Sequence, residues 1–258
     1  MTKKHTFIPF EKEKSEKTYK EAQNWRKGQF QKKDHKVEDW PKPITYDGKK
    51  ILSHVQTGDK IYAYAHGLQA ACEITNTRMN QKGRERITPE TFVDRLIESG
   101  LSTDKTPFQL NLFMCQSGKT YDTYGSKADP SLKGKVIAGE VTKALKEKGF
   151  RNVKIVGYTE PLKAAITRIY DEDKKDYIFR SGYVEMDTKG DLTSKEGRAK
   201  NVQRIFNIDL KGNISDSMPD GSIYHQPKVA RPVSDPPTIS KSLYERALRE
   251  VTRSPELD

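Results

Sequence analysis

The chain has 258 residues, of which 33% are hydrophobic and 32% are charged. This length suits one large α/β domain or two small ones, and the low apolar fraction predicts a compact part shorter than the whole chain. Lysine and arginine number 47 against 36 aspartates and glutamates, a net charge of +11. The excess favours polyanionic partners, but acids are interleaved with the bases, so a solvated lysine-rich surface accounts for it and nucleic acid is not the expected partner.

Composition also argues against several protein classes. No run approaches the roughly 18 apolar residues of a membrane span, and no apolar segment typical of a signal peptide follows Met1. Two cysteines, Cys72 and Cys115, are too few for a disulfide-stapled domain of this size. We therefore expect a cytoplasmic protein, or one secreted without a classical signal peptide into a host cell. No Cys-x-x-Cys or His-Glu-x-x-His spacing occurs, so no metal site is predicted.

The first 43 residues predict a charged N-terminal arm, partly helical between Glu11 and Lys36, which ends at Pro41-Lys42-Pro43. We expect the compact domain to span residues 44–214. Residues 215–258 begin as a proline-rich loop and end in a predicted helix that packs on the core.

Apolar runs alternate with helical patterns in the first part of this domain, which is typical of a parallel sheet with right-handed crossovers. The clearest helix start is Thr88-Pro89-Glu90, with threonine as the cap and proline in the first position. Gly100 ends that helix. In chain order we predict a strand over residues 60–65, a helix over 88–99, a strand over 108–114, a helix over 135–148 and a strand over 153–158.

The pattern is less regular beyond Thr159. Residues 161–169 fit a helix or a loop. Residues 177–186 and 204–210 alternate well enough for two strands, joined by a charged connection over 187–201. We expect these two strands to form a β-hairpin flap.

Two of the predicted strands end in the same way. One runs into His66-Gly67 and the other into Cys115-Gln116-Ser117-Gly118. Ligands of an open parallel sheet bind beyond the carboxyl ends of its strands, so we expect His66 and Cys115 to meet at one edge. A cysteine nucleophile needs a nearby base and donors for an oxyanion, and Gly67 leaves room for an amide donor.

This order of features resembles the caspase-like (clan CD) cysteine peptidases, which include caspases, clostripain, gingipains, separase and the autoprocessing protease domains of bacterial toxins. Their pattern is an apolar strand ending in His-Gly, a helix, and an apolar strand ending in the catalytic Cys. His66 precedes Cys115 by 49 residues, close to the caspase spacing, although one extra residue separates Cys115 from its glycine. The helix and strand over 135–158 are similar to clostripain-type and toxin members, so the resemblance covers residues 58–160.

The resemblance implies a three-layer caspase-like sandwich, with a mostly parallel central sheet flanked by helices and a β-hairpin flap. It also implies a cysteine endopeptidase that cuts protein or peptide substrates through a thioester acyl-enzyme and requires no cofactor, in a bacterial effector or self-processing toxin. Cys115 would be the nucleophile, His66 the general base or acid, and the amides of Gly67 and Cys115 the oxyanion hole. Arg180 and Asp187 lie in the segment that shapes the P1 pocket in this family, where either is equally compatible with an exposed strand position.

Toxin members of the family are activated by inositol hexakisphosphate bound to a basic surface that includes a flap. The resemblance therefore suggests a polyanionic activator here, although a charged exposed loop would have the same composition. The candidate residues lie around the predicted flap connection: Lys189, Lys195, Arg198, Lys200 and Arg204.

Two other functions remain open. A different cysteine acyl-transfer enzyme, such as an acetyltransferase or deamidase, would need an acid within hydrogen-bond reach of His66, and Glu85 and Glu90 are the candidates. A non-catalytic basic binding module would hold His66 and Cys115 far apart beside a continuous basic stripe. We expect the remaining reactive residue types to be non-catalytic: Cys72, His54 and His225.

Overall fold

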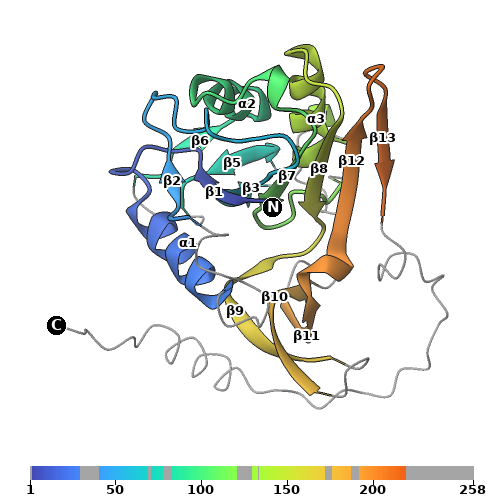
Figure 1. Ribbon diagram of the computed structural model, residues 1–258. Helices are drawn as coiled ribbons and strands as arrows, with labels where there is room; N and C mark the ends of the chain where they lie inside the picture. The colour runs from blue at the N-terminus through green and yellow to red at the C-terminus, as the bar shows by residue number, and fades with distance from the viewer. Residues whose placement is uncertain are drawn as a thin grey trace. The chain divides into compact units, whose positions relative to one another are not determined.

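The computed structural model describes residues 2–29, 41–68, 71–77, 83–120, 130–132, 134–171, 176–186 and 192–218. A seven-stranded sheet lies at the centre of this part of the chain, in the order β13-β12-β8-β7-β3-β1-β2 (Figure 1). The strands from β8 to β2 are parallel, whereas β12 is antiparallel to β8 and to β13. The class is therefore α/β with a mostly parallel central sheet, as predicted.

The seven strands of the central sheet are short, with two to six residues each. They are β1 (Lys4–Ile8), β2 (Ile44–Thr45), β3 (Lys60–Tyr64), β7 (Phe108–Phe113), β8 (Val153–Tyr158), β12 (Gln203–Ile208) and β13 (Ile214–Ser217). Two three-stranded antiparallel sheets accompany it. One is formed by β4 (His66–Leu68), β5 (Glu73–Thr75) and β6 (Arg86–Ile87), and the other by β9 (Leu162–Asp171), β10 (Asp176–Met186) and β11 (Leu192–Arg198).

Helices lie on both sides of the central sheet, an arrangement compatible with three layers (Figure 1). The helices α2 (Pro89–Glu98) and α3 (Ile137–Glu147) lie side by side above the sheet in that view, and α1 (Glu16–Gln29) lies below it. Short 3-10 turns cover Thr103–Lys105, Pro130–Leu132 and Ala199–Val202. Among the described residues, no helix is both long and apolar enough to cross a membrane.

The predicted strand–helix–strand–helix–strand unit is confirmed as β3-α2-β7-α3-β8. Thr88 caps α2, since its hydroxyl accepts a hydrogen bond from the Thr91 N–H. Gly100 follows with a φ of +95°, a left-handed conformation that favours glycine. The apolar faces of α2 and α3 are buried, as the 3.6-residue spacing of their apolar side chains predicts.

The core begins earlier than the sequence suggested. We expected it near Ile44, but β1 lies between β3 and β2 and pairs with both. Its first residues are polar, so the sequence pattern does not identify the strand. His5 and Thr6 are nevertheless buried, with 1% and 0% of their surface exposed. His5 is tolerated there because its ring binds the buried carboxylate of Asp59.

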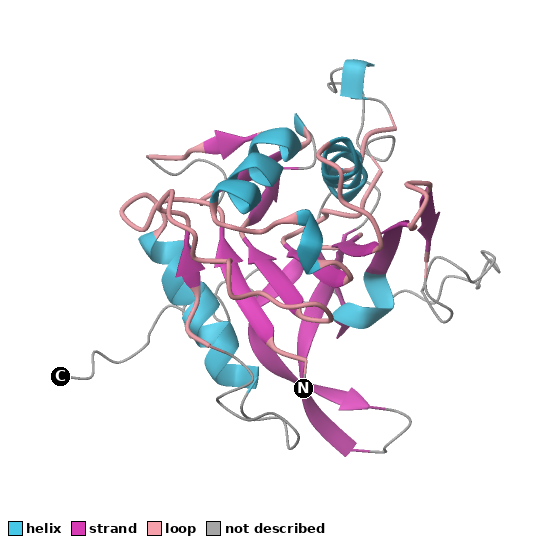
Figure 2. Ribbon diagram, turned by 45° about the horizontal axis from the view of Figure 1, so that its top comes forward, coloured by secondary structure: helices cyan, strands magenta, loops and turns pink. Residues whose placement is uncertain are grey.

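The predicted β-hairpin flap is wrong in the strands that it was expected to contain. Residues 161–169 were expected as helix or loop, but β9 covers Leu162–Asp171, and the supposed connection contains β11. The strands β9 and β11 flank β10 in a separate sheet, which extends below the central sheet (Figures 1 and 2). The strand near 204–210 is β12 of the central sheet instead, because Phe206 and Ile208 are buried where it pairs with β8.

Candidate active site

The carboxyl ends of β3 and β7 bring the two predicted reactive segments to the same edge. These strands pair in parallel with Tyr64 opposite Phe113. His66 and Cys115 each lie two residues beyond that pair. His66 opens β4, and its side chain is 17% exposed.

The backbone of Gly67 lies directly against the backbone of Cys115. A Cβ added at Gly67 would come within 2.1 Å of the Cys115 carbonyl oxygen and 3.3 Å of its carbonyl carbon. No side chain fits at such a distance from a main-chain atom, so this position requires glycine. The backbones of Gly67 and Cys115 are therefore in contact.

The Cys115 thiol is half-buried and lies beside the first residue of β9. The Leu162 N–H donates a hydrogen bond to Cys115 Sγ at 3.4 Å, and Sγ lies 3.8 Å from the Leu162 carbonyl oxygen. The sulfur therefore contacts both polar backbone groups of Leu162, which hold it in place. The sheet formed by β9, β10 and β11 thus contacts the candidate nucleophile directly.

The turn after Cys115 is fixed by hydrogen bonds to neighbouring elements. Gln116 adopts a φ of +55°, which is uncommon for a residue other than glycine. Ser117 is fully buried, and its hydroxyl donates to the Leu112 carbonyl at 2.9 Å and accepts from the Tyr158 N–H at 3.1 Å. The Ala138 N–H at the start of α3 donates to the Ser117 carbonyl at 2.8 Å. The sharp turn is therefore over-determined by its surroundings, as is common where a reactive side chain is held in place.

The turn after Cys115 also packs against the neighbouring strands β8 and β12. A Cβ at Gly157 would come within 2.8 Å of Gly118 Cα, so β8 and the turn pack backbone to backbone. Arg204 of β12 donates from Nη1 to the Thr120 hydroxyl at 2.8 Å and to the Gly118 carbonyl at 3.4 Å. The rest of its guanidinium forms a bidentate ion pair with Asp216 of β13.

The site also contains an acid that we did not predict. Glu21 of α1 places its Oε2 atom 3.5 Å from His66 Nε2, and the two side chains are 16% and 17% exposed. We expected Glu85 or Glu90 in this role. Instead, Glu85 forms a 2.7 Å ion pair with Arg95, and Glu90 is exposed in the first turn of α2. A charged helix before the core carries no local signal that one of its carboxylates faces a histidine 45 residues later.

Further acidic groups lie close to the turn after Cys115. Glu160 is 2% exposed, and its carbonyl accepts the Gln116 N–H at 3.4 Å. Burial raises the pKa of Tyr183 on β10, and the carboxylates of Glu185 and Glu160 add to this rise. Tyr183 pairs with Leu162, so a buried tyrosine lies beside the residue that contacts the thiol.

The second cysteine has the character of a structural residue. Cys72 is buried, and burial raises its pKa to about 11, with a further contribution from Glu140. A thiol with so high a pKa is a poor nucleophile near neutral pH.

The predicted substrate-binding residues are only partly described. The backbone of Arg180 lies on β10 opposite Thr167, and its side chain is not among those that the structure describes. Asp187 lies outside the described residues altogether, as do Lys189 and His225. Of the other basic candidates, Lys195 lies on β11, Arg198 is half-buried, Lys200 is exposed, and Arg204 is engaged with Asp216.

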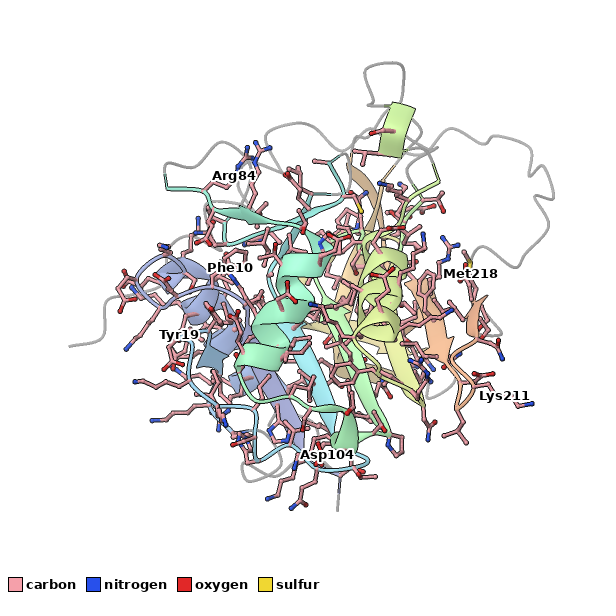
Figure 3. All side chains as sticks on the ribbon, turned by 90° about the horizontal axis from the view of Figure 1, so that it is seen from above. Phe10, Tyr19, Arg84, Asp104, Lys211 and Met218 are labelled. Atoms are coloured by element: carbon pink, nitrogen blue, oxygen red, sulfur yellow. The ribbon has the colours of Figure 1, made fainter. Side chains whose placement is uncertain are left out.

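A cavity of about 530 Å³ opens at the other end of the central sheet. Lys50, Ile97, Asp104 and Lys148 are among its lining residues. Asp104 lies in the turn before β7, at the opposite end of the molecule from Arg84 near the small β4-β5-β6 sheet (Figure 3). The cavity is thus separate from the site around Cys115, which follows the carboxyl end of β7.

Within the described residues, no group of three or more histidine, cysteine, aspartate or glutamate side chains is arranged to hold a metal ion. No protein-family model matches the sequence, and no curated protein matches it either.

Proposed function

We propose that the chain is a caspase-like cysteine endopeptidase. The observation that carries the proposal is the contact between Gly67 and the carbonyl of Cys115, which brings the ends of two parallel strands together. A histidine and a cysteine that follow the carboxyl ends of neighbouring parallel strands suit nucleophilic catalysis.

In the proposed reaction, His66 accepts the thiol proton of Cys115 and the thiolate attacks the scissile carbonyl. The amides of Gly67 and Cys115 would stabilise the oxyanion of the tetrahedral intermediate. As that intermediate collapses, the C–N bond breaks and His66 returns its proton to the leaving amine, which gives a thioester on Cys115. Water, deprotonated by His66, then hydrolyses the thioester and restores the thiol.

The setting proposed for this activity follows from the same resemblance. The substrate is a protein or peptide, and the protein acts inside a cell, either its own or a host cell that it enters as an effector or self-processing toxin. A polyanion such as an inositol phosphate remains the proposed activator, and Lys200 is an exposed base next to the sheet that contacts the thiol.

A cysteine-reactive peptide probe tests the nucleophile. Cys115→Ala should abolish labelling, because it removes the thiol that is half-buried and leaves only the buried thiol of Cys72. Cys72→Ser is the matched control and should leave labelling unchanged, since that thiol is buried and has a raised pKa. Circular dichroism would show that both variants fold. Undiminished labelling of folded Cys115→Ala would overturn the assignment.

A different cysteine acyl-transfer enzyme is the second candidate, and Glu21 is the observation that favours it. Its carboxylate lies within ion-pair distance of His66, which gives an acid, a histidine and a cysteine in one site. The two candidates differ in the group that receives the acyl chain. Release of a peptide with a new amino terminus identifies the peptidase, whereas transfer to an amine or loss of ammonia from glutamine identifies the alternative.

A further inference from the structure

The N-terminal helix α1 contributes a carboxylate to the candidate site. Glu21 Oε2 lies 3.5 Å from His66 Nε2, and both side chains are more than four-fifths buried. Charges at this separation interact appreciably when solvent screening is reduced.

The helix is held in this position by Trp25, four residues after Glu21 and so on the same side of α1. The Trp25 ring centroid lies 4.7 Å from that of Phe113 and 5.9 Å from that of Tyr64. Those two rings are the last residues of β7 and β3, the strands that lead to Cys115 and His66. Trp25 is 1% exposed, so the helix packs on the strand ends through a buried aromatic cluster of Trp25, Phe113 and Tyr64.

Two further contacts fix α1 against the segments around the site. Trp25 Nε1 donates to the Ser181 hydroxyl of β10 at 3.1 Å. The Thr18 hydroxyl donates to the Asn76 carbonyl, and Asn76 directly follows Thr75, the residue paired with His66 in the small sheet. The position of Glu21 relative to His66 is thus set by contacts before and after it along the helix, at Thr18 and Trp25.

We infer that Glu21 is a positioning residue for His66, which makes α1 an integral part of the active site. The nearby carboxylate favours a proton on Nε2 of His66, which leaves Nδ1 as the nitrogen that exchanges a proton with the thiol. It also stabilises the imidazolium that forms when the thiol loses its proton. This inference rests on the proposed function, because it assumes that His66 and Cys115 exchange a proton.

Alkylation of Cys115 by iodoacetamide across a range of pH tests the inference without any substrate. In Glu21→Gln, which keeps the size of the side chain and removes its charge, the pH midpoint of alkylation should rise by about one unit. The alkylation rate near pH 6 should fall about tenfold, because fewer molecules hold the imidazolium–thiolate pair. Peptide mapping would confirm that Cys115 is the residue alkylated.

Glu16→Gln is the matched control, since Glu16 lies on the same helix and is exposed, where it forms an ion pair with Lys20. Its alkylation profile should coincide with that of the wild type. A wild-type midpoint near that of a free thiol would contradict the proposed function itself. A lowered wild-type midpoint that Glu21→Gln leaves unchanged would overturn only the role of Glu21. A purely structural role for Glu21 would lower the unfolding temperature without moving the midpoint.

Discussion

At the scale of single residues, Gly67 makes the meeting of the two strand ends possible. We predict that Gly67→Ala is destabilising by about 3 kcal/mol and abolishes probe labelling of Cys115. The added Cβ would lie 2.1 Å from the Cys115 carbonyl oxygen, and a main-chain atom cannot turn away as a flexible side chain can. Denaturant unfolding and probe labelling would measure the two effects.

Gly139→Ala is the control for this prediction. Gly139 lies inside α3, where an added Cβ would meet the Phe206 ring at an ordinary 3.5 Å. Alanine is the better helix former by up to about 1 kcal/mol, so this variant should be as stable as the wild type or more so. Normal stability and labelling in Gly67→Ala would show that the two segments do not pack as described.

Residue-level prediction from the sequence succeeded where the signal was local. His66, Gly67 and Cys115 follow apolar strands directly, so their place at the edge of the sheet follows from strand topology. Glu21 was missed because its partner is distant in the sequence and one carboxylate on a charged helix has no distinguishing pattern. The roles of Arg180 and Asp187 in substrate binding stay predictions.

At the scale of elements, the N-terminal strand β1 is anchored by a cluster of buried polar groups. His5 Nε2 lies 2.9 Å from Asp59 Oδ2, and His54 Nε2 lies 3.3 Å from His5 Nδ1. The Asp59 carboxylate also accepts the backbone N–H groups of Lys3 and Gln56. The cluster ties β1 to the turn that precedes β3.

This cluster predicts that acid weakens the fold. Burial lowers the pKa of His54, and electrostatic interaction with His5 and Lys3 lowers it further, while Asp59 opposes the shift. Burial alone would raise the pKa of Asp59, but hydrogen bonds from His5, Gln56 and Lys3 hold it below its usual value. On unfolding, His54 therefore takes up a proton, and the free energy of unfolding should fall as the pH drops through about 6.5. Asp59 adds a further loss as the pH falls through its lowered pKa.

Urea unfolding at about pH 7.5 and about pH 5.5 would measure the effect of His54. The His54→Gln variant cannot take up this proton, so its stability should depend less on pH over that interval. The number of protons taken up on unfolding should be smaller than in the wild type by up to about one. An equal dependence in the variant and the wild type would show that His54 does not contribute.

Prediction of the elements was limited by what each one packs against. The strands β3, β7 and β8 are apolar and internal, so their sequences alone identify them. The strand β1 was missed because it contains a buried histidine, His5, whose partners Asp59 and His54 lie more than 45 residues away. The strand β9 was missed because its segment fits strand, helix and loop, and only pairing with β10 decides between them.

At the scale of the whole molecule, three separate parts of the chain converge on one sheet edge. The helix α1 reaches His66 through Glu21, the β9-β10-β11 sheet reaches Cys115 through Leu162, and β12 holds the turn after Cys115 through Arg204. The class of the fold and the edge that carries the site followed from the order of the elements. The roles of the N-terminal segment and of the small sheet required the three-dimensional structure.

Digestion of a peptide library, with and without inositol hexakisphosphate, tests the central claim most directly. Mass spectrometry would identify new amino termini and the residue preferred on their amino-terminal side. We predict that the wild type creates such termini with a consistent P1 preference, and that both Cys115→Ala and His66→Ala create none. A wild type that cuts nothing under either condition, or a Cys115→Ala variant that cuts as well as the wild type, would contradict the proposal of a cysteine endopeptidase.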